Sequence, residues 1–429
     1  MSRAIPFGKY LLIERINVGG MAEVFKAKPA GTRGLEQLVA IKRILPAVAQ
    51  DPAFVRMFVE EARTAQRLAH PNIVRILELG RVGHSVFLAM EYVRGKDLRA
   101  IAHRMREQGK RVPVPLACHV VMKACEGLHH AHEQRDADGR RLGLVHRDVS
   151  PQNVLVSIAG EVKLIDFGIA KAANKAAKAG TGVLEGKFAY MSPEQVRGLP
   201  LDRRSDVFSA GIVLYELLTG ERLFVGASDF SILEKVRNAE IEPPSRVTSS
   251  VPPELERIVL RALARDPDER FQTAADLQEA LESFLYSSGT FFGARDLSAW
   301  VGEVFSRDIE AERIREEQYR LLEEEMADDS DKLGGPDTER HPVVPEQGAP
   351  APGNKPPGRK KTMVGLGAPP PAPPAAASAQ GGGGASGGGS GGLSDWDDDD
   401  MATQVYDKAQ HGTATPSEPP PSPAAPSSK

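Results

Sequence analysis

Cysteine is almost absent from this chain of 429 residues, which has only Cys118 and Cys125. Two cysteines close together in one segment provide neither the set of bridges that stabilises small secreted domains nor the ligand spacing of a zinc site. They fit a reducing compartment. We therefore expect a cytoplasmic protein.

Long apolar runs are missing as well. The most apolar window, residues 207–220, is interrupted by Glu216 and falls short of the roughly 20 residues that cross a bilayer. The N-terminal MSRAIPFGKY lacks the apolar core of a signal peptide. We expect no membrane span.

Charge of one sign is not in excess either. The formal net charge is −4, with 26% charged residues, so the balance gives no sign of a nucleic-acid or membrane-surface partner. Glycine and proline, by contrast, number 41 and 33 and crowd into the last hundred residues. Such a composition buries too little apolar surface to fold, and we expect residues 329–429 to be a disordered tail.

The rest of the chain divides by its periodicity. Short β-rich runs dominate residues 8–93, with one helical stretch, PAFVRMFVEEARTAQRLA, among them. Helical periodicity takes over in residues 94–286, apart from two short strands, NVLVS and EVKLIDF. This predicts an α+β fold of two lobes, a small strand-rich one and a larger helical one.

A helical extension is predicted for residues 287–328. Between Asp296 and Met326 a helix carries one apolar stripe and then a charged run, AERIREEQYRLLEEE. The stripe consists of Leu297, Trp300, Val301, Val304 and Phe305. Such a stripe favours docking on the large lobe, and the alternative is a surface for a partner protein or for a second copy in a dimer.

One constellation carries the chemistry. Asp148 and Asn153 stand in HRDVSPQN, and Asp166 follows a predicted strand in DFG. Phosphoryl transfer needs a carboxylate for the acceptor hydroxyl and oxygen ligands for Mg²⁺. Asp148 suits the first role, and Asn153 with Asp166 suits the second.

Two further charges lie upstream. The strand QLVAIKRI presents Lys42, a point charge for nucleotide phosphates, and Glu61 lies on the lone helix of the small lobe. An ion pair between strand and helix would hold the ammonium in place.

The segment from about Tyr10 to Leu285 resembles the eukaryotic-like (Hanks-type) serine/threonine protein kinases of bacteria. VAIK, FVEEA, HPNIV, MEYV, HRDxxxxN, DFG, SPE and DVFSAG occur in the order and spacing of that family. The resemblance implies a bilobal, ATP- and Mg²⁺-dependent protein kinase acting on protein substrates in signal transduction. It implies Asp148 as the catalytic base and a Lys42–Glu61 ion pair.

The resemblance also assigns the nucleotide site and one structural ion pair. Glu194 of SPE would bind Arg270 of DERFQTA. The residues implied to bind nucleotide are Asn17, Val18, Gly19, Gly20, Val24, Ala40, Lys42, Met90, Glu91, Val93, Asn153, Leu155 and Asp166.

Three positions depart from the family pattern. The glycine loop, NVGGMAEV, keeps only the middle glycine of three, and Asn17 stands at the first; asparagine tolerates left-handed backbone, which would preserve the turn. Ser150 replaces a lysine, and Lys187 replaces a threonine in GKFAYMSPE. Because these two changes are reciprocal, we hypothesise that Lys187 lies beside Asp148 and Ser150 and shields the transferring phosphate.

Regulation has its own candidates. Thr181 is the one Ser or Thr between Ile169 and Met191, and its phosphate could bind Arg147 and order the loop; a threonine without a role is the alternative. In the tail, Thr362 follows a basic run and Thr403 an acidic one. Either could recruit a phosphothreonine-reading partner or be part of a spacer.

The sequence thus predicts an active serine/threonine kinase. The alternative is a nucleotide-binding pseudokinase scaffold, for which the three departures leave room. Retention of Lys42, Asp148, Asn153 and Asp166 favours the active enzyme.

Overall fold

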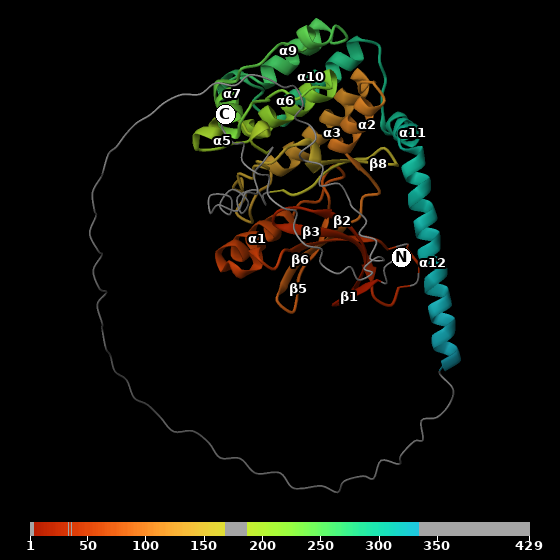
Figure 1. Ribbon diagram of the computed structural model, residues 1–429. Helices are drawn as coiled ribbons and strands as arrows, with labels where there is room; N and C mark the ends of the chain where they lie inside the picture. Colours follow the sequence, from red (N-terminus) through yellow and green to blue (C-terminus); the bar gives the residue numbers. More distant parts are fainter. Residues whose placement is uncertain (1–3, 33, 36, 168–186, 334–429) are drawn as a thin grey trace, which may run out of the picture. The chain divides into compact units, whose positions relative to one another are not determined.

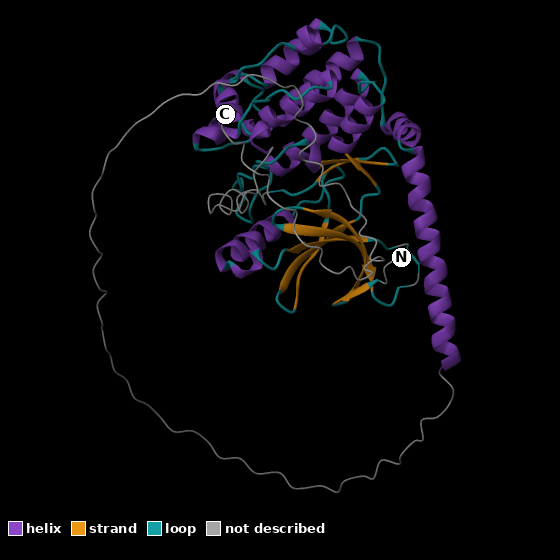
Figure 2. Cartoon of the chain, viewed as in Figure 1, coloured by secondary structure: helices purple, strands orange, loops and turns teal. Residues whose placement is uncertain are grey.

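The computed structural model describes residues 4–32, 34–35, 37–167 and 187–333, all of which belong to one structural unit. Most strands of this unit lie at one end and most helices at the other (Figure 2). Within it, no helix is both long and apolar enough to cross a membrane.

The small lobe is built on an antiparallel sheet of six strands in the order β1-β2-β3-β4-β6-β5. Alternation of side chains gives the sheet two apolar faces: Phe87 and Ala89 of β6 lie in one cluster, and Val86, Leu88 and Met90 lie in the other. The strands are β1 (Ile5–Phe7), β2 (Tyr10–Val18), β3 (Ala22–Pro29), β4 (Val39–Ile44), β5 (Ile76–Val82) and β6 (Ser85–Glu91).

One helix, α1 (Pro52–Ala65), covers the second face of the sheet (Figure 1). It begins at Asp51, whose side chain accepts a hydrogen bond from the N–H of Ala53 at 2.8 Å, with proline at the first helical position. Phe54, Phe58 and Ala62 recur every four residues and are buried against the sheet. A short 3₁₀ helix of three residues, η1 (Val48–Gln50), precedes α1.

The large lobe contains the main apolar core, around α3 (Val114–His132) and α6 (Arg204–Thr219), which are buried on nearly all sides. A three-stranded sheet, β7-β8-β9, lies at the lower edge of this lobe in Figure 2, on the side of the small lobe. The remaining elements are β7 (Gly95–Asp97), α2 (Leu98–Glu107), η2 (Pro151–Asn153), β8 (Val154–Ser157), β9 (Val162–Leu164), η3 (Lys187–Tyr190), α5 (Pro193–Arg197), α7 (Asp229–Asn238), α8 (Pro244–Val247), α9 (Pro253–Ala262), η4 (Pro267–Glu269) and α10 (Ala274–Ser287).

The extension forms two helices, where the sequence pattern predicted one. α11 (Ala294–Val304) ends at Phe305, and α12 (Ser306–Leu333) begins at the next residue. The backbone of Phe305 leaves the helical region, with φ −112° and ψ 21°, which lets its ring turn into the large lobe. In the structure α12 extends to Leu333, past the predicted boundary at residue 328.

The docking of the apolar stripe on the large lobe is confirmed. Leu297, Val301 and Phe305 are at most 2% exposed and belong to the main core. The N-terminus of α11 lies against the turn between β8 and β9, where Ser298 Oγ donates to the carbonyl of Ile158 at 2.7 Å. Gly160 in that turn has φ +79°, and a Cβ there would collide with the carbonyl oxygen of Ala294.

Candidate active site

A buried aspartate holds the segment that carries Asp148. Asp206, in the first turn of α6, is fully buried, and its carboxylate accepts hydrogen bonds from the N–H groups of His146 (2.7 Å) and Arg147 (2.8 Å). Arg147 has φ 69°, a left-handed conformation that is unfavourable for a side chain of its size. The two bonds to Asp206 therefore stabilise a strained turn next to Asp148.

Asp206 stays ionised despite its burial. Desolvation would raise the pKa of its carboxyl, but the hydrogen bond and charge of His132, at 2.7 Å, together with the backbone donors, hold the pKa below the ordinary value. A charged acceptor strengthens hydrogen bonds to backbone N–H groups. His132 of α3 thus supports the turn through Asp206.

The ring of His146 connects the two segments that carry the acidic groups. Its Nδ1 accepts the N–H of Asp148 at 3.3 Å, so Nε2 carries the proton and donates to the carbonyl of Ile165 at 3.0 Å. The ring also packs on Phe167, with the centroids 4.4 Å apart. The ring of His146 therefore fixes the segments of Asp148 and Asp166 relative to each other.

Asn153 is fixed at the same place. Its side-chain nitrogen donates to the backbone carbonyl of Asp148 at 2.7 Å, and its own carbonyl accepts the N–H of Ile165 at 3.0 Å. With the amide nitrogen committed to Asp148, the side-chain oxygen is the atom that can face a cation. Ser150 lies between them, 7% exposed, and its carbonyl accepts the N–H of Asn153 at 3.0 Å.

Lys42 reaches this group from the small lobe. Its Nζ lies 2.6 Å from Oδ1 of Asp166, whose backbone is left-handed with φ 64°. Among the described residues, the ion pair of Lys42 is with Asp166 and not with Glu61, so the expected Lys42–Glu61 pair is not formed in this conformation. The left-handed turn directs the Asp166 carboxylate at the ammonium, and a charge-assisted bond of this length satisfies it. Glu61 lies on α1 with both carboxylate oxygens buried.

The glycine turn joins β2 and β3 without left-handed backbone. Gly19 donates its N–H to the carbonyl of Ala22 at 2.8 Å. Asn17 lies in extended β2, paired with Val24, so the expected left-handed conformation at Asn17 was wrong. The strand ladder satisfies this position, and Val18 ends it with its side chain half exposed.

The adenine end of the predicted site is formed by the pairing of β4 with β6. Ala40 lies opposite Met90, and Lys42 lies opposite Leu88. Glu91, the last residue of β6, accepts a hydrogen bond from Lys163 Nζ of β9 at 2.9 Å. Residues 92–94, between β6 and β7, form the linker between the two lobes. Val93 follows in the linker and Leu155 lies in β8, and both are partly buried against the small-lobe core.

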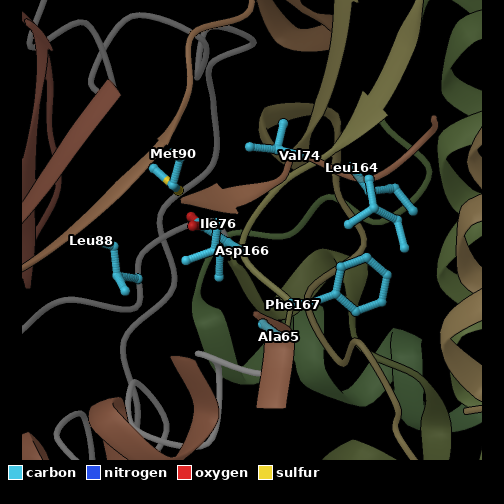
Figure 3. A pocket seen from close by; sticks show the side chains of 9 residues that line it. Ala65, Val74, Ile76, Leu88, Met90, Leu164, Asp166 and Phe167 are labelled. Carbon is cyan, nitrogen blue, oxygen red and sulfur yellow. The ribbon is translucent and has the colours of Figure 1, made fainter. Parts of the chain in front are cut away.

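A small apolar pocket opens behind Met90 (Figure 3). It includes Met90 and Asp166 of the predicted nucleotide site, so the two spaces adjoin. Asp166 is the one charged residue among those that line it, which are Ala65, Ile73, Val74, Ile76, Leu88, Met90, Leu164, Asp166 and Phe167.

Glu194 and Arg270 form a buried ion pair with two parallel bonds. Arg270 Nη1 and Nη2 lie 2.7 and 2.9 Å from the two carboxylate oxygens, and Ser205 Oγ adds a third bond at 2.6 Å. Glu194 lies in the first turn of α5, whose N-cap Ser192 forms a capping box with Gln195. The Gln195 side chain also donates to the carbonyl of Arg147 at 3.0 Å, which ties α5 to the strained turn.

Three of the predicted residues, and the side chain of a fourth, lie outside the described part of the chain. Lys187 begins η3, but its side chain is outside the described residues, and so is all of Thr181. The tail threonines, Thr362 and Thr403, are outside them as well.

The donor set fits a magnesium ion. Asp166 supplies a carboxylate and Asn153 an oriented amide oxygen, both hard oxygen ligands from adjoining segments. Lys42 adds a positive charge beside them for phosphate oxygens. With Asp148 next to Asn153, the arrangement can neutralise a phosphate chain and accept a proton from a hydroxyl group.

The comparisons with known proteins agree with this chemistry. A family model described as the protein kinase domain matches residues 10–283. The chain belongs to the protein kinase family. A crystal structure of the PknI kinase domain from Mycobacterium tuberculosis, a cysteine-to-alanine mutant, matches with a TM-score of 0.51 at 25% identity, covering 66% of this chain and 98% of that chain.

Two curated relatives show how far the kinase similarity extends. Tyrosine-protein kinase MasK of Myxococcus xanthus is 42% identical over 310 residues, covering 72% of this chain and 48% of that protein. Serine/threonine-protein kinase PknB of Mycolicibacterium smegmatis is 39% identical over 279 residues, covering 64% and 42%. The kinase chain thus matches less than half the length of either relative.

Sequence reasoning missed two residues of the kinase site. It singled out DVFSAG but gave Asp206 no role, and it did not connect His132 with the turn at Arg147. A charged residue at the start of an otherwise apolar helix was the available signal, because a buried carboxylate needs several donors.

Proposed function

We propose that the chain is a serine/threonine protein kinase that transfers the γ-phosphate of ATP to hydroxyl groups of proteins. The observation that carries the proposal is the assembly of Lys42 from one lobe with Asp148, Asn153 and Asp166 from the other. Several similar proteins, PknB among them, are named serine/threonine kinases. Cytosolic signalling is the role that we propose for it.

Each of these residues has a defined task. Asp148 accepts the proton of the acceptor hydroxyl, and the hydrogen bond from Asn153 to its carbonyl keeps it in place. Bound Mg²⁺ would be held by Asn153 and Asp166 and supplies charge neutralisation for the phosphates. Lys42 orients the phosphate chain as a fixed positive charge.

The test is phosphate incorporation from labelled ATP with Mg²⁺. Asp148→Asn should reduce incorporation by several orders of magnitude, because the proton acceptor is lost while the size of the side chain is kept. Asp138→Asn, at an exposed position, is the matched control and should behave as wild type. Nucleotide binding without transfer in the wild type would instead identify a pseudokinase scaffold.

Tyrosine is the second candidate acceptor. MasK, a relative at 42% identity, is named a tyrosine-protein kinase, and Ser150 and Lys187 alter the part of the site next to the acceptor. Phosphoamino-acid analysis of the products decides between the two. Phosphotyrosine alone would refute the serine/threonine assignment.

We further propose that Lys187 supplies a cation beside Asp148 and Ser150. Ser150 is buried in the segment that connects Asp148 with Asn153. Its hydroxyl carries no charge, so a cation next to Asp148 has to come from another residue. Lys187→Ala should lower kcat by about one to three orders of magnitude. Ser150→Lys in that background should restore part of it, and turnover at the wild-type level in Lys187→Ala would refute the exchange.

Arg147 supports a regulatory role for Thr181. Its Nε is buried and, among the residues that the structure describes, has no hydrogen-bond partner, which suits an anion such as phosphothreonine. Autophosphorylation should therefore map to Thr181, and Thr181→Ala should slow activation. Mass spectrometry that finds full activity without phosphate on Thr181 would contradict this.

The tail threonines are proposed as a docking site for a phosphothreonine-reading domain. Thr362 and Thr403 each follow a run of like charges, an arrangement suited to a short linear motif. Loss of binding to a phosphothreonine-reading domain in the Thr362→Ala, Thr403→Ala variant is the expected result.

A further inference from the structure

A row of acidic residues runs along one face of α12. Asp308, Glu312 and Glu316 are four residues apart, so they lie on the same side of the helix. α12 extends from the large lobe past the linker and alongside the small lobe (Figure 1). The three carboxylates meet basic groups of all three regions in turn.

The first carboxylate meets the large lobe. Asp308 lies 3.0 Å from Arg104 Nη1 on α2 and 3.7 Å from Lys96 Nζ on β7. Both cations lie over the ring of Phe305, which directly precedes α12 and is buried in the large-lobe core. This end of the helix is therefore held by apolar packing as well as by charge.

The next two carboxylates meet the linker and the small lobe. Glu312 accepts hydrogen bonds from Tyr92 OH at 3.1 Å and from Lys26 Nζ at 2.9 Å. Glu316 lies 2.7 Å from the same Lys26 and 2.6 Å from Arg94 Nη2. One lysine of β3 is thus bound by two successive turns of α12.

Lys26 is poorly placed for any other partner. It is 3% exposed, and its ammonium lies over the ring of Tyr92 at 5.0 Å. Burial would lower its pKa, but the bonds to Glu312 and Glu316 raise the pKa above the ordinary value. A buried ammonium without counter-charges is strongly unfavourable, so β3 in this position depends on α12.

The position of Lys26 in the sheet connects it with the nucleotide. Val24 and Lys26 point to the same face of β3, since side chains alternate along a strand. Lys26 also pairs directly with Ala40 on β4, and both Val24 and Ala40 belong to the predicted nucleotide site. A movement of β3 relative to the large lobe would therefore displace Val24 and Ala40 and change the shape of the predicted nucleotide site.

We infer that α12 is an inter-lobe clamp, in which Glu312 and Glu316 bind the positioning residue Lys26 and hold the small lobe in its nucleotide-binding orientation. This rests on the proposed function as far as nucleotide binding is concerned. A site that is correctly formed only in one lobe orientation has an apparent affinity reduced by the population of the others. Opening and closing of such clefts also controls product release.

The test uses charge reversal in the full chain. Glu312→Lys with Glu316→Lys replaces both contacts of Lys26 by repulsion. Glu310→Lys with Glu317→Lys is the matched control, because these two glutamates bind Arg313 and Arg320 of the same helix. Lys26→Glu in the first variant restores opposite charges and is the rescue.

Lobe orientation is measured directly, by the distance distribution between spin labels on His84→Cys and Glu254→Cys. Both positions are exposed, one on each lobe, whereas native Cys118 and Cys125 are buried and escape labelling. The double reversal should broaden the distribution, and the control should not. An unchanged distribution would overturn the clamp, whether or not the protein transfers phosphate.

Binding of MgADP is the second readout. The double reversal should raise Kd about tenfold, and the rescue should bring it back to within about twofold of wild type. A merely structural role would lower the melting temperature and leave Kd unchanged in the folded protein. A broadened distribution with unchanged Kd would therefore refute the positioning role, and wild-type protein that binds no nucleotide would refute the proposed function instead.

Discussion

Replacement of Arg270 by methionine should destabilise the large lobe more than almost any other single substitution. Its guanidinium is 1% exposed and makes five hydrogen bonds. Two go to Glu194, and the others go to the carbonyls of Ala264, Arg204 and Arg265. All five donors of the side chain are used.

The magnitude follows from what is left behind. Methionine fills much of the same volume but leaves the carboxylate of Glu194, 7% exposed, without its cation. Breaking a buried pair in this way costs about 3–5 kcal/mol, whereas replacing both partners by apolar groups costs far less. We therefore expect Arg270→Met to lose about 4 kcal/mol and the double variant with Glu194→Met to regain a large part.

The same pair should appear in the dependence of stability on pH. Desolvation would raise the pKa of Glu194, but Arg270 and Ser205 hold the pKa below its ordinary value of 4.5. The folded chain then binds fewer protons than the unfolded one, so the stabilisation is complete above 4.5 and is lost as pH falls through the lower folded value. In the Arg270→Met variant, the free energy of unfolding should therefore fall less at acid pH than it does in the wild type.

Equilibrium unfolding in urea, followed by far-UV circular dichroism at pH 7 and pH 4, measures both effects. Arg203→Met, at a partly exposed arginine of the same region, is the control. A free energy of unfolding for Arg270→Met within about 1 kcal/mol of wild type would refute the reasoning, since a broken buried pair costs several times more. So would a double variant no more stable than the single one.

Three other substitutions test separate parts of the molecule. Asp206→Asn removes the charged acceptor beneath Arg147, so kcat should fall at least about tenfold with little change in the KM for ATP, as steady-state kinetics would show. Burial raises the pKa of Glu216 to about 7, so the folded state binds the extra proton and wild-type stability falls as pH rises from 4.5 to about 7. Glu216→Gln should abolish that fall, by about 1.4 kcal/mol per pH unit at most, in urea unfolding at several pH values. Gly160→Ala should detach α11, because its Cβ meets Ala294, and hydrogen exchange of α11 amides should then accelerate.

The sequence was most informative where chemistry demands fixed residue types. Asp148, Asn153 and Asp166 lie together because two short strands and the turns beside them bring their segments into contact. The two-lobe architecture also followed from the change of periodicity, since strand and helix patterns differ in their repeat.

The partner of Lys42 could not be read from spacing. Glu61 and Asp166 are both acidic, so either could pair with Lys42. The left-handed backbone at Asp166 decides between them, and no local sequence pattern predicts that conformation. The break at Phe305 is similar: the apolar stripe is continuous in sequence, and the helix ends there because the ring packs into the core.

Contacts between distant segments were the least predictable. Lys26 reads as a surface residue of a strand, and Glu312 and Glu316 read as part of a solvated charged run. They meet across nearly three hundred positions of the chain, so only the course of the chain in space reveals them. Burial of Lys26 has no periodic signature, because an alternating strand predicts which face a residue takes but not what covers it.

The burial of Leu297, Val301 and Phe305 indicates that the catalytic domain extends beyond α10. The family match stops at 283, yet these side chains complete the large-lobe core beyond that point. A shortened chain that ended with α10 would expose the apolar surface of the large lobe on which these side chains pack, and exposed patches of this kind promote aggregation. The match to MasK spans 310 residues, more than the 283 that precede the end of the family match, so it must include part of the extension. By burial, the smallest stable catalytic fragment should include Phe305.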